Sequence, residues 1–263
     1  MNNRPAVYLD YNATAPLAPE AAEAISAWLK ERAANPSSLH LAGQQARAAV
    51  EAARADVASF LAVDPAAVVF TSGGTEADNL ALWGALGWPP TGHLVVSAIE
   101  HPAVLEPAAA LKRLGVAVTR VGVDAEGIVD PREVERALRP NTRLVSVMAA
   151  NNEVGSLQPV AEIAAIAHAA GALFHCDAVQ AAPWMDLAPL TAVADLLSLS
   201  AHKLAGPVGI GCLTVRGGLD LQAFVRGGGT LVTFERGDEL VIERFGVPVR
   251  NALDGVGQPD LVL

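Results

Sequence analysis

The sequence predicts an α/β fold, in which helices cover both faces of a mostly parallel, seven-stranded sheet. From residue 67 onward, apolar runs of strand length alternate with segments whose apolar residues recur at helical spacing. Of the 263 residues, 52% are hydrophobic and only 17% charged, which is enough apolar surface for a sizeable core. Polar clusters follow several of the apolar runs, at the strand ends where such sheets bind ligands.

The chain begins with elements that precede this alternation. Residues 6–9 predict a short strand that leads into a polar turn. Pro19 is expected to open a helix that reaches about Arg32, with Ile25, Trp28 and Leu29 on one stripe. After a loop at 35–38, apolar residues at helical spacing predict a long helix over 39–61.

The alternation itself supplies the sheet and its covering helices. Strands are expected at 67–71, 93–98, 116–121, 143–148, 172–176, 195–199 and 210–215, and helices at 75–86, 102–114, 131–138 and 159–170. The last helix is opened by Pro159. A strand, helix, strand rhythm predicts parallel neighbours and a sheet buried on both faces.

Composition and motifs exclude several classes of protein. The formal net charge of −10 argues against a general nucleic-acid binder. No apolar run reaches the length of a membrane span and the N-terminus lacks an apolar signal segment, so a cytoplasmic protein is expected. Cys176 and Cys212 lie in apolar strand-like runs without metal or disulfide spacing, and are interpreted as inert core thiols.

The first polar cluster, Thr71-Ser72-Gly73-Gly74-Thr75, leaves a strand and opens a helix. Two glycines permit a tight turn, and the free N–H groups of the first helical turn face outward. A phosphate would bind well at such a helix start. The alternative is an ordinary glycine-bearing turn that Thr75 caps.

Three further clusters follow strands. His101 precedes a helix and could stack on a flat ring, move protons or simply cap the loop. Asn151 and Asn152 carry two amides able to bond a ring hydroxyl or a carboxylate, and Gln180 carries another that could bond the ring oxygen. Asp177 ends an apolar strand, where its burial is costly unless it meets a cation or a strong donor. The protonated nitrogen of pyridoxal phosphate (PLP) is such a partner.

Lys203 follows the apolar run 195–199 and lies in a turn fixed by Gly206 and Pro207. A lysine beside a buried strand is paired or used, and one use is a Schiff base with PLP. Each cluster has an ordinary structural explanation when it is taken alone. Their joint occurrence after strands of one sheet predicts a PLP site.

The motifs together resemble a known group of enzymes. They are Tyr8-Leu9-Asp10, Asn35-Pro36-Ser37-Ser38-x-His40, Thr71-Ser72-Gly73-Gly74-Thr75-Glu76, Glu100-His101, Asn151-Asn152-Glu153-Val154-Gly155, His175-x-Asp177-Ala178-x-Gln180 and Ser200-Ala201-His202-Lys203. This pattern resembles the NifS/IscS-like cysteine desulfurases, in class V of the fold-type I PLP enzymes. The resemblance runs in order from about residue 7 to Gly229.

The resemblance implies a role for each site residue. Lys203 would carry PLP as a Schiff base, and Lys203 and His101 would be the catalytic acid–base candidates. The cofactor-binding residues would be Gly74, Thr75, His101, Asn152, Asp177, Gln180, Ser200, His202 and Lys203. Among them Gly74, Thr75, Ser200 and His202 would hold the phosphate, His101 would stack on the ring, and the remaining side chains would bond it. No metal is implied.

The resemblance ends after Gly229. Residues 1–229 are therefore interpreted as a PLP-binding class V domain, whose segment 1–34 would pack on a small C-terminal domain. That domain, with its sulfur-accepting cysteine loop, is expected to be missing or replaced by a divergent tail at 230–263. This tail could form a hairpin, with strands at 231–234 and 239–245, or be a frame-shifted or otherwise altered end.

The resemblance implies conversion of L-cysteine to L-alanine, with sulfur passed to an acceptor or scaffold protein for iron–sulfur cluster or thio-cofactor assembly. A homodimer with neither nucleic acid nor membrane partners is expected, with activity impaired by the absent cysteine loop. The alternatives are another class V aminotransferase or lyase, and a non-catalytic remnant that binds PLP.

Overall fold

The computed structural model describes residues 7–31, 34–217 and 219. The chain divides into two units, Met1–Gly228 and Gly229–Leu263, and every described residue belongs to the first. The hairpin predicted within 230–263 lies outside the described residues. The division of the sequence into a PLP domain and a tail stays a prediction.

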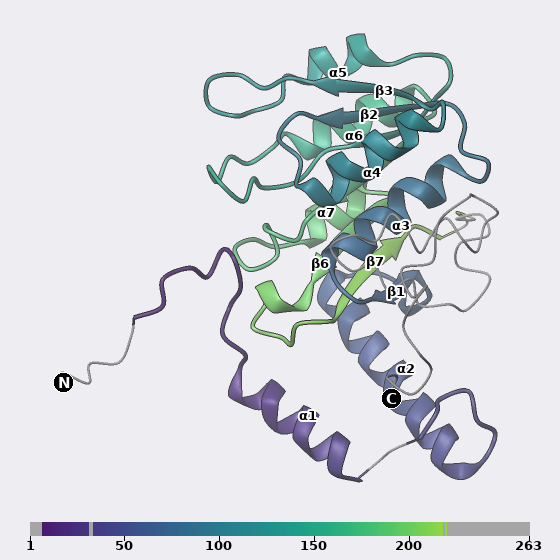
Figure 1. Cartoon of the computed structure of the whole chain (residues 1–263), viewed down its shortest axis with the longest axis vertical. Helices are drawn as coiled ribbons and strands as arrows, with labels where there is room; N and C mark the ends of the chain where they lie inside the picture. Colours follow the sequence, from purple (N-terminus) through teal and green to yellow (C-terminus); the bar gives the residue numbers. More distant parts are fainter. Residues whose placement is uncertain (1–6, 32–33, 218, 220–263) are drawn as a thin grey trace, which may run out of the picture. The chain divides into compact units, whose positions relative to one another are not determined.

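Seven strands form one sheet in the order β1-β7-β6-β5-β4-β2-β3 (Figure 1). The strands are β1 (Val68–Thr71), β2 (His93–Ser97), β3 (Ala117–Val121), β4 (Thr142–Ser146), β5 (Leu173–Asp177), β6 (Leu196–Ser200) and β7 (Gly211–Val215). Strand β7 is antiparallel to β1 and to β6, and the other pairs are parallel. The predicted fold class is confirmed. All strands except β7 point the same way, so their carboxyl ends meet at one edge.

Helices cover both faces of the sheet (Figure 1). One face carries α3 (Gly74–Leu86) and α4 (Pro102–Arg113), and the other carries α5 (Pro131–Ala137), α6 (Val160–Ala169) and α7 (Ala188–Val193). Alternation along β2 separates the two apolar layers. Leu94 and Val96 pack with α3 and α4, whereas Val95 packs with the opposite layer.

Two helices precede the sheet. In α1 (Pro19–Glu31) the predicted apolar stripe is only partly covered, because Ile25 and Trp28 are half-buried and Leu29 is 75% exposed. Helix α2 (Leu41–Leu61) packs its carboxyl-terminal end into the layer of α6 and α7 through Ala58 and Leu61. No helix in the described ranges has the length and apolar character needed to cross a membrane.

The structure corrects two predictions about elements. The strand predicted at 6–9 does not form in its described part, residues 7–9. The Tyr8 hydroxyl instead donates to the carbonyl oxygens of Asp10 (2.7 Å) and Thr14 (3.0 Å), on either side of a turn at 11–13. Helix α7 was not predicted, since its six residues include a proline and are too few to show helical periodicity.

Candidate active site

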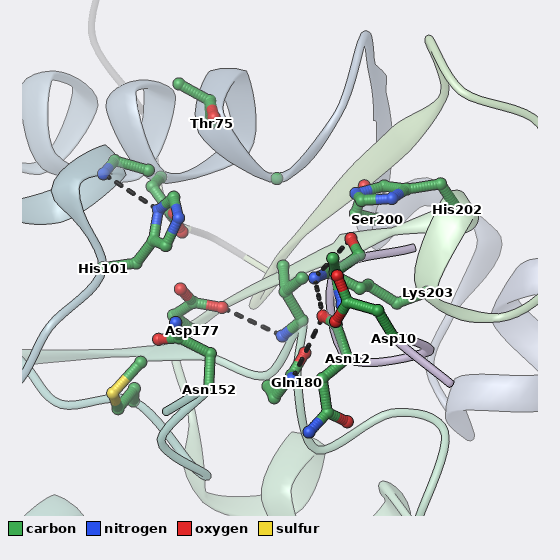
Figure 2. A pocket seen from close by; sticks show the side chains of 16 residues that line it. Asp10, Asn12, Thr75, His101, Asn152, Asp177, Gln180, Ser200, His202 and Lys203 are labelled. Carbon is green, nitrogen blue, oxygen red and sulfur yellow. Dashed lines mark hydrogen bonds between the residues drawn. The ribbon is translucent and has the colours of Figure 1, made fainter. Parts of the chain in front are cut away.

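The carboxyl edge of the sheet holds a pocket of about 490 Å³, a volume typical of small-molecule sites. All nine residues that the sequence analysis selected line it: Gly74, Thr75, His101, Asn152, Asp177, Gln180, Ser200, His202 and Lys203 (Figure 2). The sequence analysis missed further lining residues, namely Asp10, Asn12, Ala13, Asp78, Ala103, Met148 and Val179.

The start of α3 forms one wall of the pocket. A Cβ at Gly74 would lie 2.7 Å from Cγ2 of Val179, so only glycine lets the helix approach the loop after β5 this closely. The helix N-cap is Gly73 and has no side-chain cap bond, which argues against the alternative that Thr75 caps the turn. First-turn N–H groups have no acceptor within a helix, and therefore suit an anion here.

A polar row lies beneath the pocket, between α3 and the sheet. On this face Leu144, Leu173 and Leu196 near the strand starts give way to Ser146, His175 and Ser198 further along. The His175 ring shares hydrogen bonds with the hydroxyls of Ser146 (Nδ1, 2.8 Å) and Ser198 (Nε2, 2.9 Å). Burial lowers the pKa of His175 to about 4, so its ring is neutral near pH 7.

Asp177 ends β5 at the floor of the pocket and is 5% exposed. Its Oδ1 accepts a hydrogen bond from the N–H of Val179 at 2.9 Å. Within the described chain it forms no ion pair with a lysine or arginine. Burial, reinforced by the nearby Asp78 carboxyl, raises the pKa of Asp177 to about 7. The pocket therefore presents a buried acid without a cationic partner.

Two more acids are buried beside Asp177, and the sequence analysis selected neither. Asp78 on α3 is 1% exposed, and burial raises its pKa to about 7. Glu100 accepts hydrogen bonds at Oε1 from the Ser97 hydroxyl (2.5 Å) and the Met148 N–H (2.8 Å), and burial raises its pKa well above the usual value. A sequence signal existed for Asp78, because it follows Gly74 by one helical turn.

Lys203 lies in the short 3-10 helix η2 (Ala201–Lys203) that follows β6, and its amine meets the N-terminal segment. Nζ donates to the carbonyl oxygens of Asn12 and Ala13, the latter at 2.9 Å (Figure 2). The segment is docked by the Ala15 N–H, which donates to the His202 carbonyl at 2.9 Å. Burial lowers the pKa of Lys203, although the Asp10 and Asp177 carboxylates oppose this shift.

The remaining predicted residues divide between structural and pocket-facing roles. His101 caps α4, since its Nδ1 accepts from the Ala103 N–H at 3.1 Å, and its ring also lines the pocket. Of the two adjacent amides, Asn151 holds its own loop by accepting from the N–H groups of Glu153 and Val154, both at 2.9 Å. Asn152 is the amide that lines the pocket.

The chemistry of this pocket is specific in its combination of groups. Figure 2 shows His101 and Asp177 on one side, and His202 and Lys203 on the other. Helix N–H groups suit an anion, a buried unpaired acid suits a basic nitrogen, and a desolvated amine suits an aldehyde. The residues present therefore fit a phosphorylated, nitrogen-containing ring aldehyde.

Comparisons with known proteins agree with this geometry. The profile of the family Aminotransferase class-V matches residues 7–245. The chain is 44% identical over 224 residues to the cysteine desulfurase IscS of Dictyoglomus turgidum, covering 84% of this chain and 57% of that protein. It is 46% identical over 225 residues to a cysteine desulfurase of Cereibacter sphaeroides, covering 84% and 58%.

Solved structures give the same result. A NifS-like protein superposes with a TM-score of 0.79 at 36% identity, covering 83% of this chain and 61% of the other. The structure described as SspA in complex with cysteine gives 0.76 at 38% identity, covering 80% and 61%. The chain thus spans about three fifths of the length of these relatives. Since the family profile matches nearly the whole chain, this protein belongs to the class-V aminotransferase family.

Proposed function

We propose that this chain binds PLP and provides the cofactor-bearing part of a cysteine desulfurase. The main observation in support of this proposal is that Lys203, Asp177 and the start of α3 line the same pocket. The relatives named as cysteine desulfurases support the choice of L-cysteine as substrate, as does the neighbouring structure with cysteine bound.

Each predicted residue has a proposed task in that site. Backbone N–H groups at Gly74 and Thr75, with the side chains of Ser200 and His202, bind the phosphate. Asp177 receives the ring nitrogen, His101 lies against the ring, and the amides of Asn152 and Gln180 bond the ring hydroxyl. When bound, PLP supplies an electron sink for charge that develops next to the substrate amine.

Lys203 and His101 are the proposed acid–base groups. Whenever the Lys203 amine is free, the Asn12 and Ala13 carbonyls to which it donates would hold its ammonium form. As a free amine it can take a proton from the substrate carbon and return it elsewhere. General acid–base help of this kind contributes roughly 10²–10⁴-fold in rate.

The sulfur acceptor is proposed to lie outside these 263 residues. The sequence contains two cysteines, and both are buried, in β5 and β7. Burial raises the pKa of Cys176 well above its usual value and that of Cys212 to about 11, so neither supplies a thiolate near pH 7. A small thiol or an acceptor protein therefore takes the sulfur, for iron–sulfur cluster or thio-cofactor assembly. We further propose that the protein works in the cytoplasm as a homodimer.

The cofactor assignment is tested by borohydride reduction of the chain after PLP is added. Reduction should fix the cofactor to Lys203, as peptide mass spectrometry would show. Lys30 and Lys112 are internal controls, because neither lines the pocket. A label on either control in place of Lys203 would refute the site.

The buried cysteines also favour a second candidate, a class V lyase or aminotransferase that needs no acceptor thiol. The two reactions leave different products from L-cysteine. Alanine with dithiothreitol-dependent sulfide supports the desulfurase, whereas pyruvate supports an eliminating lyase. A folded, PLP-loaded chain that turns over no amino donor would instead be a binding remnant.

A further inference from the structure

The pocket and its surroundings hold more buried acid than one cation can balance, because Asp78 and Asp177 line the pocket and Glu100 is buried beside them. Asp78, Asp177 and Glu100 are each at most 5% exposed, and none forms an ion pair with lysine or arginine within the described residues. Ionising two neighbouring carboxyls without cations in a buried site is strongly unfavourable. A single ring nitrogen can neutralise only one of them.

Asp78 has few contacts that could stabilise a negative charge. Its Oδ1 is buried and has no hydrogen-bond partner in the described chain, and although the Ser198 hydroxyl lowers the pKa of this carboxyl, burial raises it by more. The nearest cationic candidate, Nε2 of His175, lies 3.5 Å away and already shares a hydrogen bond with Ser198. His175 also uses its other nitrogen, toward Ser146, so this ring cannot turn to pair with Asp78.

Asp177 differs from Asp78 because both a backbone N–H and the neighbouring His101 favour its ionised form. Its Oδ1 accepts the Val179 N–H at 2.9 Å, which stabilises a carboxylate. Asp177 and Asp78 are linked through the polar row between α3 and the sheet. Ser198 is the register partner of Asp177 on β6 and shares a hydrogen bond with His175, whose Nε2 lies 3.5 Å from Asp78. When one of these two carboxyls loses a proton, the negative charge is therefore better stabilised on Asp177 than on Asp78.

We propose that Asp78 is a positioning residue for the cofactor: it keeps its proton in the loaded site, so that Asp177 alone ionises toward the ring nitrogen. The Asp177 carboxyl would give its proton to an unprotonated ring nitrogen, whose lone pair would form the new N–H bond, and Asp177 would be left as the carboxylate. Asp78 retains its own proton and prevents a second buried anion. The loaded-site half of this proposal rests on the proposed function, whereas protonation of Asp78 in the cofactor-free chain does not.

Other titratable groups face this acid pair and set its environment. From the sheet they are His175 and Cys176, from the loop before α4 they are Glu100 and His101, and from η2 it is Lys203. Burial keeps His175 neutral, and Glu100 is itself buried. Lys203 and His101 act on Asp177, and neither lowers the pKa of Asp78.

The test follows the carboxyls directly by infrared spectroscopy of the whole chain with carboxyl-labelled aspartate. The parent, D78N and D177N are titrated between about pH 5 and about pH 9, a range that brackets both raised pKa values, with and without PLP. D56N, which changes an exposed aspartate on α2, is the matched control. Asparagine is the neutral isostere of a protonated aspartic acid.

In the cofactor-free parent at about pH 5, where groups with pKa near 7 are protonated, two protonated-acid bands are expected. D78N should remove one and D177N the other, whereas D56N should remove neither. On addition of PLP the Asp177 band should vanish and the Asp78 band persist.

Two results would overturn the proposal. In one, the Asp78 band is absent in the cofactor-free chain at about pH 5, where a pKa near 7 requires it. In the other, PLP removes the Asp78 band and spares that of Asp177. If D78N fails to fold, the labelled parent and D177N still decide, because the band that survives in D177N belongs to Asp78. If PLP fails to bind at all, the proposed function fails while the cofactor-free bands still test Asp78.

Discussion

Asp177 and Asp195 are both 5% exposed and lie at opposite ends of neighbouring strands. Asp195, just before β6, accepts from the Phe174 N–H (2.8 Å) and His168 Nε2 (2.7 Å), and pairs with Arg216 (3.0 Å). Asp177, at the end of β5, accepts one backbone N–H and pairs with no arginine or lysine in the described chain.

The difference shows how to tell a structural acid from a functional one when burial is equal. The protein completes the contacts of Asp195, which therefore ties β5, α6 and the end of β7 together. It leaves Asp177 incomplete, although an unpaired buried acid destabilises the fold. An incomplete buried acid that faces a pocket is the signature of a group that a ligand completes.

The strongest test of this contrast is Asp177→Asn in the PLP-loaded chain. Loss of the carboxylate removes the partner of the ring nitrogen, so the spectral response of bound PLP to L-cysteine should slow about 10³-fold, or about 4 kcal/mol. Stopped-flow absorbance measures it. Stability toward urea should be equal or higher without PLP. A normal spectral response would assign Asp177 to the structural class.

Asp195→Ala should have the opposite profile. Removing it leaves the Phe174 N–H and the Arg216 guanidinium without their partner, which should cost about 3 kcal/mol of unfolding free energy. The lower end of the usual range applies because Arg216 is partly exposed. Urea denaturation at constant pH measures the loss. An unchanged midpoint would show that the pairing at this end contributes nothing.

The pH dependence of stability sharpens the same contrast. The pKa of Asp78 and of Asp177 is raised from 3.8 to about 7 in the folded chain. Their effect on the free energy of unfolding is absent below about pH 4, where both carboxyls are protonated in the folded and in the unfolded chain. Between about pH 4 and 7 the unfolded chain releases its protons first, so stability falls as pH rises.

As the pH rises from about 5 to about 8, the unfolding free energy of Asp78→Asn should therefore increase by about 2 kcal/mol relative to that of the parent. The comparison must be with the parent, because His93 and His175 have their pKa lowered to about 4. They therefore decrease the stability of the folded protein as the pH falls through the same region. Thermal unfolding at several pH values measures the difference. A variant curve parallel to that of the parent would contradict the prediction.

The smallest expected effect is at His168, which is more exposed than its partner Asp195. His168→Ala should cost only about 1 kcal/mol, because the Phe174 N–H and Arg216 still satisfy the aspartate. Urea denaturation beside Asp195→Ala measures it. A loss as large as that of Asp195→Ala would mean that the histidine, not the arginine, completes this site.

Sequence reasoning located the strands and the pocket well because both depend on local patterns. Apolar runs end where parallel strands end, and polar residues after those runs meet at one edge whatever the loops do. Strand direction was less accessible: nothing in the residues of β7 shows that it runs antiparallel to β6, since the reversal depends on the short connection through η2.

The missed site residues share a different cause. Asp78 lies within a helix whose apolar residues dominate the pattern, and its function depends on contacts across the sheet with His175 and Ser198. Asn12 contributes a backbone carbonyl, which no side-chain pattern reveals. Long-range contacts of this kind arise from tertiary packing. The spacing from Gly74 places Asp78 on the same side of its helix, but it does not reveal these contacts.

The docking of the N-terminal segment on η2 has a consequence for biosynthesis. Lys203 bonds to carbonyls 190 and 191 positions earlier, and His202 to Thr14 across 188 positions. At about 5–20 residues per second, the ribosome needs about 10–40 s to make the intervening chain. The Tyr8 hydroxyl contacts span only two and six positions, so the turn can form early and wait. The segment around Asn12–Thr14 is therefore synthesised first, but it can complete the wall of the pocket only after Lys203 has been synthesised.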